Sequence, residues 1–586
     1  SGIGQEAIAV GATLAMDPTE WIMPLHRNLG VFTSRKMPLT DLFKQWQGDR
    51  SSYSKARERS FHFGSKAHHV CGMISHLGPQ LAIADGVALA YQQRGQLKAS
   101  MAFTGDGGTS EGDFHEALNV AAVWNLPVIF IIENNGYGLS TPTNEQYKCD
   151  HLVDRAKGYG MEGIRIDGNN ILEVYQTVIG VRDYCINQQK PYLIECDTFR
   201  MRGHEEASGV KYVPKELFEL WAKKDPLQNF EDFLVKKKII TSSDIESYRA
   251  AIQAEIEAGI AVGFSKTDTL VSTEAELADI YAPFDNQAIA PSTAQVSEKK
   301  MIQAISEALD QSMQRHPNLI LMGQDIAAYG GAFKVTEGLM DTYGKERVRN
   351  TPLCESAIIG AGLGLSIKGY KAMVEMQFAD FVSVGFNQIV NNLAKIHWRW
   401  GQNADVVVRM PTGGGVAAGP FHSQSNEAWF VHSPGLKVVY PSNPYDAKGL
   451  LIAAINDPNP VMYFEHKALY RNKQLAQEIP DEAYTVEIGK AKLVRQGEDV
   501  SIVTYGMGVH WAYNASGELD MRDQIEIIDL RTLFPLDEDA IMRSVKKTGK
   551  CLVVTEEPSN NSFALALAGK IQEQCFQYLD APVMTI

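Results

Sequence analysis

The sequence has no uninterrupted apolar segment of the length that crosses a membrane. A spanning helix needs roughly 18 or more apolar residues, whereas the strongest apolar run beside a motif, PVIFII, has the length of a strand. The first residues, SGIGQEAIAV, lack a basic stretch followed by a long apolar one, so no signal peptide is visible. We therefore expect a cytoplasmic protein without a membrane partner.

Cysteine and basic side chains are also scarce. The seven cysteines form no C-x-x-C pair, which excludes a disulfide framework or a zinc site as the organising element and suits a reducing compartment. The 55 basic residues are outnumbered by 70 acidic ones, giving a net charge of −15. Because nucleic acid and anionic membranes both favour a basic face, neither is expected as the main partner.

What is present is an ordinary globular composition over 586 residues, enough for three or four domains. Strand-sized apolar segments alternate with helical ones, which predicts doubly wound α/β domains with parallel sheets. We predict two such domains over residues 1–265 and 298–475, and a third, smaller α/β domain over 476–586. A polar segment with two prolines, residues 266–297, is expected to link the first two.

Individual elements follow from the same patterns. In the first domain we predict strands over 98–108, 127–135 and 191–198 and a helix over 111–124, followed by a helix near Ser243 whose spacing to Glu246 is typical of a capping box. The second domain begins with a strand over 319–325 and a small-residue helix over 356–369. SIVTYG, IEIIDL and CLVVTEE predict three strands in the third.

Two glycine-containing segments follow neighbouring predicted strands, where ligands of α/β sheets bind. They are GDGG (Gly105, Asp106, Gly107 and Gly108) and ENNGYG, which contains Asn135 and Tyr137. Glycines let the backbone approach a diphosphate closely, and a following helix offers free N–H groups. Asp106 and Asn135 carry the hard oxygen donors that Mg²⁺ prefers. GDGG alone is also typical of a tight turn, but the asparagine pair after the next strand favours a magnesium–diphosphate site.

These motifs resemble the fingerprint of thiamine diphosphate enzymes, in which G-D-G is followed about one helix and one strand later by N-N. GQEA, EGDFHEALNVAA, ENNGYGLSTPT and TFRMRGH resemble the α subunit of 2-oxo acid dehydrogenase complexes. NTPLCE, EMQFADF, FHSQSNEAWF and PGLKVVYPSNPYDAKGLL resemble the β subunit, and DLRTLFPLD its carboxyl-terminal, transketolase-like domain. The chain thus resembles a fused α–β form of the decarboxylating dehydrogenase component, with two thiamine diphosphate-binding domains and a transketolase C-terminal-like domain.

The resemblance implies a role for each matching residue toward thiamine diphosphate and Mg²⁺. The side chains of Asp106 and Asn135 and the backbone carbonyl of Tyr137 would hold the metal. Arg27 and His204 would contact the diphosphate, and His204 would also help to order the site. The aminopyrimidine ring would be faced from the α-type half by Ser75 and Leu77 and from the β-type half by Leu353 and Phe381.

Two further residues would carry the chemistry. The carboxylate matching Glu355 hydrogen-bonds a pyrimidine nitrogen and favours the imino form, which takes a proton from the thiazolium carbon. His422 matches a histidine that serves acyl transfer to a lipoyl group, where imidazole is an acid usable near neutral pH. Taken alone, Glu355 is also typical of a surface or capping glutamate, and a lone histidine is more often structural.

Some positions depart from the family pattern. His26 stands before Arg27 where relatives often have tyrosine, and Glu205 stands where regulated relatives have a phosphorylatable serine, so kinase control there is not expected. Glu205 also puts a negative charge near the diphosphate, which Arg200 and Arg202 would offset. His62, His68, His69 and His76 lie nearby, and we expect most to be polar lining or satisfied core groups.

The resemblance implies oxidative decarboxylation of a 2-oxo acid, with reductive acylation of the lipoyl group of a dihydrolipoyl acyltransferase. A branched-chain substrate is favoured and pyruvate is the alternative. Transketolase-type ketol transfer also fits the domain order but not TPLCE or HSQSNEAWF. A non-enzymatic scaffold is disfavoured by the joint presence of Asp106, Asn135, Glu355 and His422. We expect the cofactor between the first two domains, in a homodimer with two sites.

Overall fold

The computed structural model describes residues 2–205, 207, 209–265, 271–519 and 521–586. The chain divides into two compact units. Unit 1 comprises Ser1–Ala278 with Trp398–Gln402, and unit 2 comprises Asp279–His397 with Asn403–Ile586. Each unit is an α/β structure built on mainly parallel sheets, which confirms the predicted fold class.

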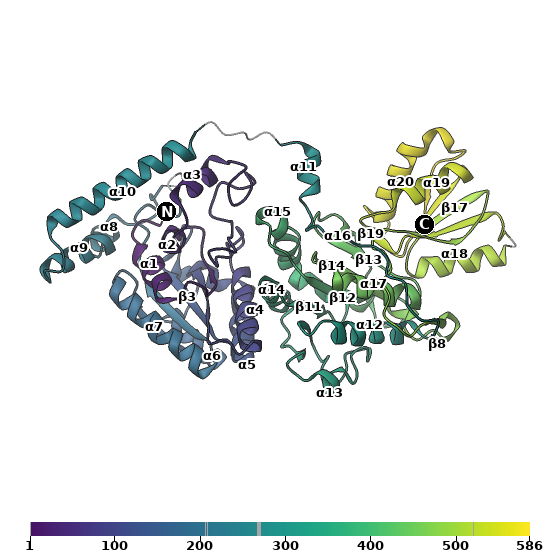
Figure 1. Ribbon diagram of the computed structural model, residues 1–586, viewed down its shortest axis with the longest axis horizontal. Helices are drawn as coiled ribbons and strands as arrows, with labels where there is room; N and C mark the ends of the chain where they lie inside the picture. Colours follow the sequence, from purple (N-terminus) through teal and green to yellow (C-terminus); the bar gives the residue numbers. More distant parts are fainter. Residues whose placement is uncertain (1, 206, 208, 266–270, 520) are drawn as a thin grey trace. The chain divides into compact units, whose positions relative to one another are not determined.

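Unit 1 is organised around a parallel sheet of five strands. Its order is β1 (Ile22–Met23), β2 (Ser100–Gly105), β3 (Val128–Asn134), β7 (Tyr192–Asp197) and β6 (Glu162–Asp167). The apolar run of β3 is buried because helices cover both faces of the sheet. One pair is α1 (Glu6–Ala15) with α7 (Ile171–Gln188), and the other is α4 (Pro79–Gln93) with α5 (Gly112–Trp124) (Figure 1).

The two glycine motifs lie where the sequence predicts them. β2 ends at Gly105 and β3 at Asn134, and Gly105 pairs with Glu133 in the parallel register. A short hairpin of β4 (Tyr137–Gly138) and β5 (Thr141–Pro142) continues the second motif. GDGG and ENNGYG are therefore adjacent at one edge of the sheet.

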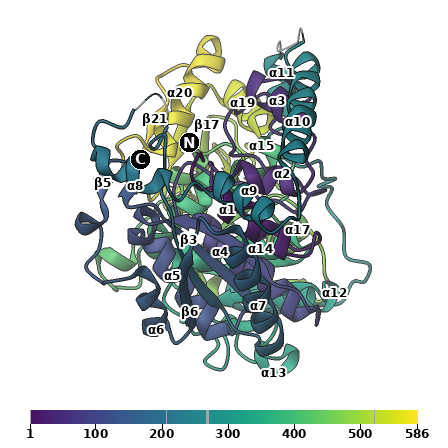
Figure 2. The same ribbon diagram turned by 90° about the vertical axis from the view of Figure 1, so that its left-hand side faces the viewer.

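The longest described helix of unit 1, α10 (Ser242–Gly263), packs beside α3 (Leu39–Gln47) (Figure 1, Figure 2). Its capping box is formed by Thr241 and Asp244, so the prediction of Ser243 and Glu246 is wrong by two residues. The Thr241 hydroxyl accepts from the Asp244 N–H at 3.2 Å, and the Asp244 carboxylate accepts from the Thr241 N–H at 2.7 Å. Within the described ranges, no helix has both the length and the apolar character to cross a membrane.

Unit 2 contains a seven-stranded sheet, parallel except at one edge. Its order is β10 (Val348–Asn350), β9 (Leu319–Gly323), β11 (Lys371–Glu375), β12 (Val406–Thr412), β14 (Val461–His466), β13 (Lys437–Val439) and β19 (Thr532–Phe534). Helices α12 (Met301–Arg315) and α17 (Pro444–Asn456) pack together, and α14 (Glu355–Ile367) packs on β11. The antiparallel strand β19 comes from the segment predicted as the third domain, so the two predicted domains share one sheet.

The remainder of unit 2 is a second five-stranded sheet. Its order is β16 (Lys492–Arg495), β18 (Ile525–Asp529), β17 (Val500–Thr504), β20 (Cys551–Val554) and β21 (Met584–Thr585), with only β16 antiparallel. It is accompanied by α18 (Met507–Glu518), α19 (Glu538–Thr548) and α20 (Phe563–Cys575). SIVTYG, IEIIDL and CLVVTEE all form strands, as the sequence predicts.

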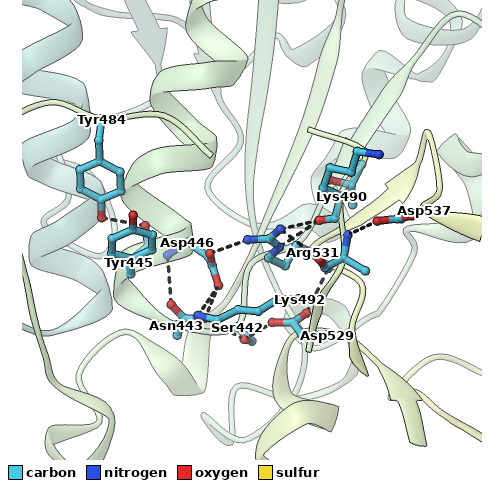
Figure 3. A network of polar contacts seen from close by, with 12 residues as sticks. Ser442, Asn443, Tyr445, Asp446, Tyr484, Lys490, Lys492, Asp529, Arg531 and Asp537 are labelled. Atoms are coloured by element: carbon cyan, nitrogen blue, oxygen red, sulfur yellow. Dashed lines mark hydrogen bonds and ion pairs between the residues drawn. The ribbon is translucent and has the colours of Figure 1, made fainter. Parts of the chain in front are cut away.

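A buried polar network ties this sheet to the first turn of α17 (Figure 3). The Arg531 guanidinium donates to Asp446 Oδ1 at 3.0 Å and to the Lys490 carbonyl at 2.7 Å, while its backbone N–H donates to Asp529 at 3.0 Å. The Ser442 hydroxyl donates to Asp529, whose pKa is raised to about 7 by burial and by Asp446. This network joins the two parts of unit 2 by charge as well as by strand pairing.

The structure describes the predicted linker, residues 266–297, from residue 271 onward. Residues 266–270 lie outside the described residues. The rest contains α11 (Thr273–Ala278) and the start of β8 (Val296–Lys299), which pairs antiparallel with β15 (Gln477–Pro480). The predicted linker therefore ends in a strand that pairs within unit 2.

Candidate functional site

Asp106 lies directly after β2, and backbone donors hold its carboxylate. The residue is 2% exposed. One oxygen accepts from the Gly107 N–H at 2.7 Å, and the other accepts from the N–H groups of Asn135 and Tyr137, both at 3.0 Å. Burial raises the pKa of Asp106, while the Gly107 hydrogen bond and the charges of Arg200 and Arg27 oppose that rise. One carboxylate thus links the two glycine motifs.

The Asn135 side chain is 2% exposed, and neither its oxygen nor its nitrogen has a hydrogen-bond partner among the described residues. A buried polar group left unsatisfied costs about 1–3 kcal/mol, so this carboxamide is prepared for a ligand. Its oxygen and those of Asp106 are the hard donors that Mg²⁺ takes. The Tyr137 carbonyl accepts from the Arg200 guanidinium at 2.9 Å and keeps its second lone pair.

These donors fit a metal that is only partly held by the protein. Over the described part of the chain, no group of three or more His, Cys, Asp or Glu side chains is placed to hold a metal ion. A cation between Asp106 and Asn135 would therefore need backbone or ligand oxygens to complete its shell. Mg²⁺ commonly completes its shell with water and phosphate oxygens.

The glycines of the first motif allow close backbone packing. A Cβ added to Gly107 would lie 2.9 Å from Gly138 Cα, and one added to Gly108 would lie 2.5 Å from Thr104 Oγ1. A side chain at Gly107 would push the two motifs apart, and one at Gly108 would clash with the end of β2. Close packing therefore explains why glycine stands at positions 107 and 108. Gly105 is the last residue of β2.

Four basic side chains form a cluster beside these motifs, which we call the basic cluster: His26, Arg27, Arg200 and His204. Arg27 Nη2 lies 3.1 Å from His26 Nε2 and 3.4 Å from His204 Nδ1, and Arg200 Nη1 lies 3.0 Å from the same His204 nitrogen. The structure thus brings together Arg27 and His204, which the sequence places 177 residues apart.

Burial and mutual repulsion shift the protonation of the basic cluster. Burial, with the charges of Arg27, His204 and His62, lowers the pKa of His26 to about 2. Burial also lowers the pKa values of Arg27, Arg200 and His204. Arg27 Nε is buried without a hydrogen-bond partner within the described residues. The two arginine cations lie close together beside neutral imidazoles, and with an unused donor on Arg27 they favour an anion rich in oxygen atoms.

A pocket of about 1040 Å³ opens onto this cluster, and we call it the unit 1 pocket. Its lining includes both predicted pyrimidine-facing residues of unit 1, together with His26, His62, Gly107 and His204, with Ser75 exposed and Leu77 half-buried. The exposed Glu205 also lines it and acts to raise the pKa of His204 slightly against the neighbouring arginines. Of the other nearby histidines, His68 bonds Ser65 at 2.8 Å and His69 meets the edge of Trp21, whereas His76 is exposed.

In unit 2, Glu355 is the first residue of α14. Its carboxylate accepts from the Gln324 amide at 3.2 Å. Gln324 is buried, and its own oxygen has no hydrogen-bond partner in the described ranges. Two residues earlier, Leu353 is 81% exposed. The junction of β10 and α14 therefore presents one apolar and one carboxylate side chain.

Phe381 and His422 lie together in the same unit. Phe381 belongs to η5 (Ala379–Gly385), which packs on α14 so closely that a Cβ on Gly385 would lie 3.1 Å from the Glu355 carbonyl. The His422 ring meets the edges of Phe378, at 4.7 Å between centroids, and of Phe381, at 5.6 Å. The structure thus places Phe381 and His422 in contact, and it packs η5, which carries Phe381, on α14, which begins at Glu355.

Three residues of these sites were not predicted as site residues. Arg200, at the end of β7, orders the Tyr137 carbonyl and His204. Glu133 is fully buried, accepts from Asn28 and from Gln5, and counters the positive charge of Arg27. Gln324 bonds Glu355. Arg200 and Glu133 stand in motifs that the sequence already singles out, so a charged residue at a buried strand end was the available signal.

Family models match the chain in three stretches: dehydrogenase E1 component over residues 1–268, transketolase pyrimidine-binding domain over 297–473, and transketolase C-terminal domain over 489–586.

Curated relatives point to the same family. The 2-oxoisovalerate dehydrogenase subunit beta of Bacillus subtilis is 45% identical over 292 residues, which are 49% of this chain and 88% of the relative. The pyruvate dehydrogenase E1 component subunit beta of the same organism is 42% identical over 295 residues, 50% of this chain and 90% of the relative. The pyruvate dehydrogenase E1 component subunit beta of Staphylococcus aureus is 41% identical over 291 residues, which are 49% of this chain and 89% of the relative. The chain therefore belongs to the E1 family of thiamine diphosphate-dependent 2-oxo acid dehydrogenases, with an α-type and a β-type part in one polypeptide.

Proposed function

We propose that this protein oxidatively decarboxylates a branched-chain 2-oxo acid and transfers the acyl group to the lipoyl group of a dihydrolipoyl acyltransferase. One observation supports this most strongly: in a chain of the E1 family, a buried carboxylate joins two glycine motifs beside an asparagine amide without a partner. That arrangement suits a magnesium–diphosphate group next to the basic cluster.

The residues of unit 1 would bind and orient. We assign Asp106, Asn135 and the Tyr137 carbonyl to Mg²⁺, and Arg27 and His204 to the diphosphate. Ser75 and Leu77, on the wall of the unit 1 pocket, would face the pyrimidine ring, as would Leu353 and Phe381 of unit 2. Thiamine diphosphate, when bound, supplies the electron sink that lets carbon dioxide leave.

The residues of unit 2 would handle protons. Glu355, oriented by Gln324, would hold a hydrogen bond to a pyrimidine ring nitrogen and thereby favour the tautomer with a basic exocyclic nitrogen. His422 would donate a proton to the departing sulfur during acyl transfer. The edges of Phe378 and Phe381 would limit rotation of the His422 ring, so that the proton-donating nitrogen keeps its orientation.

A kinetic comparison tests the substrate. The loaded protein is assayed with an artificial electron acceptor on 3-methyl-2-oxobutanoate and on pyruvate. Because each methylene in such a pocket contributes about 1–3 kcal/mol, we expect kcat/KM for the branched substrate to be at least about tenfold higher. A preference for pyruvate would make this a pyruvate dehydrogenase component. No turnover of any 2-oxo acid by cofactor-loaded protein, or ketol transfer between sugar phosphates, would refute the proposal.

A second experiment tests the metal. Asp106→Asn and Asn135→Ala should weaken Mg²⁺-dependent cofactor binding in calorimetric titrations, because each removes one oxygen of the donor set. Asp150→Asn, an exposed acid in the same unit, is the control and should bind as the wild type does. Unchanged Mg²⁺ dependence in the first two variants would contradict the assigned ligands.

The proposal also covers assembly and location. We propose a homodimer with two sites, since a two-fold pair is the simplest closed symmetry, and a cytoplasmic location. Sedimentation of the loaded protein at twice the mass of one chain would support the first, and fractionation of cells would test the second.

A further inference from the structure

The loop that carries His422 is closed at its base. It runs from Gly413 to Gln424, and both the Thr412 hydroxyl and the Gly413 N–H donate to the Gln424 carbonyl, at 3.0 and 3.3 Å. Between these ends, residues 415–421 are exposed, and His422 ends the short helix η7 (Pro420–His422). The orientation of His422 therefore depends on what holds the loop base.

A carboxylate from the carboxyl-terminal part of unit 2 holds this base. Glu556, which follows β20, accepts from the Gly414 N–H at 2.9 Å with one oxygen and bonds His466 Nε2 at 2.6 Å with the other. His466 Nδ1 accepts from the Ala468 N–H at 3.3 Å, so Nε2 is the nitrogen that carries the proton. Each oxygen of Glu556 thus has its own donor.

The base of the 413–424 loop is tightly packed. Gly413 has a φ of +79°, and a Cβ there would lie 2.3 Å from His466 Nε2 and 2.8 Å from a Glu556 oxygen. Its carbonyl accepts from Lys467 Nζ at 2.6 Å. Burial lowers the pKa of Lys467 to about 8, although Asp380 and Glu556 act to raise it. Movement of Glu556 would therefore displace the base of the loop through its contacts with both Gly414 and His466.

We propose that Glu556 is a positioning residue for acyl transfer, which presents His422 by fixing the base of the 413–424 loop. This inference rests on the role of His422 in the proposed function. It assigns to the carboxyl-terminal part of the chain, which supplies no residue to the sites described above, a share in the second half-reaction only. Decarboxylation, which uses Glu355, should not depend on it.

The test separates the two half-reactions in the loaded full-length chain. Decarboxylation is followed with an artificial electron acceptor, and acyl transfer with lipoamide. Glu556→Ala should slow acylation by about 10- to 100-fold, the usual effect of losing a supporting hydrogen-bond partner, with decarboxylation within about twofold of wild type. Glu556→Gln keeps one acceptor and the size of the side chain, so it should restore part of the rate. Glu557→Gln, the same charge change one residue away, should leave both rates unchanged.

His422→Ala is the reference that separates the two proposals. If it slows acylation and adding Glu556→Ala causes no further loss, both residues act through one element. If His422→Ala slows acylation but Glu556→Ala does not, the present inference is wrong and the proposed function stands. If His422→Ala acylates normally, or the wild type decarboxylates without acylating lipoamide, the acyl-transfer part of the proposed function fails and the inference with it. A fall in Tm of Glu556→Ala with unchanged acylation marks a structural role only and overturns the inference.

Discussion

A cluster of basic side chains lies in unit 1, and a cluster of acidic side chains lies in unit 2. The basic cluster of unit 1 contains His26 and its three neighbours, and the acidic cluster of unit 2 consists of Glu427, Glu556 and Glu557. Burial lowers the pKa of His26 to about 2, with help from Arg27 and His204. Burial raises the pKa of Glu427 to about 7, with help from Glu557 and Glu556. The same desolvation thus acts in opposite directions on the two clusters.

The clusters differ in how the protein satisfies them. The acidic cluster has internal donors: the Tyr505 hydroxyl bonds Glu427 Oε1 at 2.8 Å, and the Ala564 N–H bonds Glu557 at 2.9 Å, while Glu427 Oε2 has no hydrogen-bond partner among the described residues. His26 and His204 of the basic cluster line the unit 1 pocket, and Arg27 Nε has no partner in the described part of the chain. Glu556 uses its donors to hold the 413–424 loop, whereas His26 and His204 face a pocket that can take a ligand. We therefore expect unit 1 to control binding and unit 2 to control proton transfer.

The largest effect should come from Glu355→Gln. It removes a carboxylate that the account assigns to proton handling, so decarboxylation should fall by about 10²- to 10⁴-fold, while calorimetric cofactor affinity stays within a few-fold. Glu337→Gln, an exposed glutamate of the same unit, serves as the control. If Glu355→Gln instead lost cofactor binding, the assignment of binding to unit 1 and of proton transfer to unit 2 would be wrong.

Next in size is Arg27→Ala. Removing one member of a buried charge pair costs about 2–4 kcal/mol, so the Kd for thiamine diphosphate should rise by roughly 30- to 1000-fold. Inorganic diphosphate should raise the Tm of the wild type and not that of the variant, because only the wild type binds it tightly. Arg94→Ala, at an exposed site, should behave as wild type. Equal stabilisation of Arg27→Ala by diphosphate would place the anion elsewhere.

The dependence of stability on pH tests the comparison at His26. Its pKa falls from 6.5 in the unfolded chain to about 2 in the fold. Below pH 6.5 only the unfolded state takes up this proton, so stability falls as pH falls, by about 1.4 kcal/mol per pH unit. The Tm of His26→Gln should therefore drop less than that of wild type between pH 6.5 and 5. The exposed His432→Gln is the control; parallel Tm curves for His26→Gln and wild type would show that His26 is not held neutral.

At Glu427 we expect a pH dependence of stability that is opposite in sign to that of His26 and smaller. Its pKa rises from 4.5 to about 7 on folding, a smaller shift than that of His26. Between pH 4.5 and 7 the unfolded chain releases the proton and the fold retains it, so this contribution to stability declines as pH rises. The Tm of Glu427→Gln should lose less than that of wild type between pH 5 and 7.5. Glu498→Gln, at an exposed position, should follow the wild type, and a steeper decline for Glu427→Gln would reverse the assigned sign.

Much of the fold is readable because local patterns encode it. The run VIFII predicts β3 and the glycines after Thr104 predict the end of β2, since buried parallel strands are continuous apolar runs closed by turns. Parallel strands bring their carboxyl ends to one edge, so the approach of Asp106 to Asn135 also followed from spacing. The resemblance to a known family supplied the roles.

The contacts that sequence could not supply are those between distant segments. No periodicity in the chain pairs Arg27 with His204, or Glu556 with Gly414, because each contact is made by the ends of loops that tertiary packing brings together. The same holds for β19, which leaves its own segment to join a neighbouring sheet. At α10, the structure uses Thr241 with Asp244 in place of the predicted Ser243 and Glu246.

The proposed division of roles, in which Asp106 holds the cofactor and Glu355 activates it, is tested most directly by deuterium exchange at the thiazolium C2 carbon. We predict rapid exchange in the wild-type protein and exchange at least about a hundredfold slower in cofactor-loaded Glu355→Gln. Asp106→Ala should leave the cofactor free, with the exchange rate of the solution. Wild-type exchange in Glu355→Gln with the cofactor bound would contradict the account.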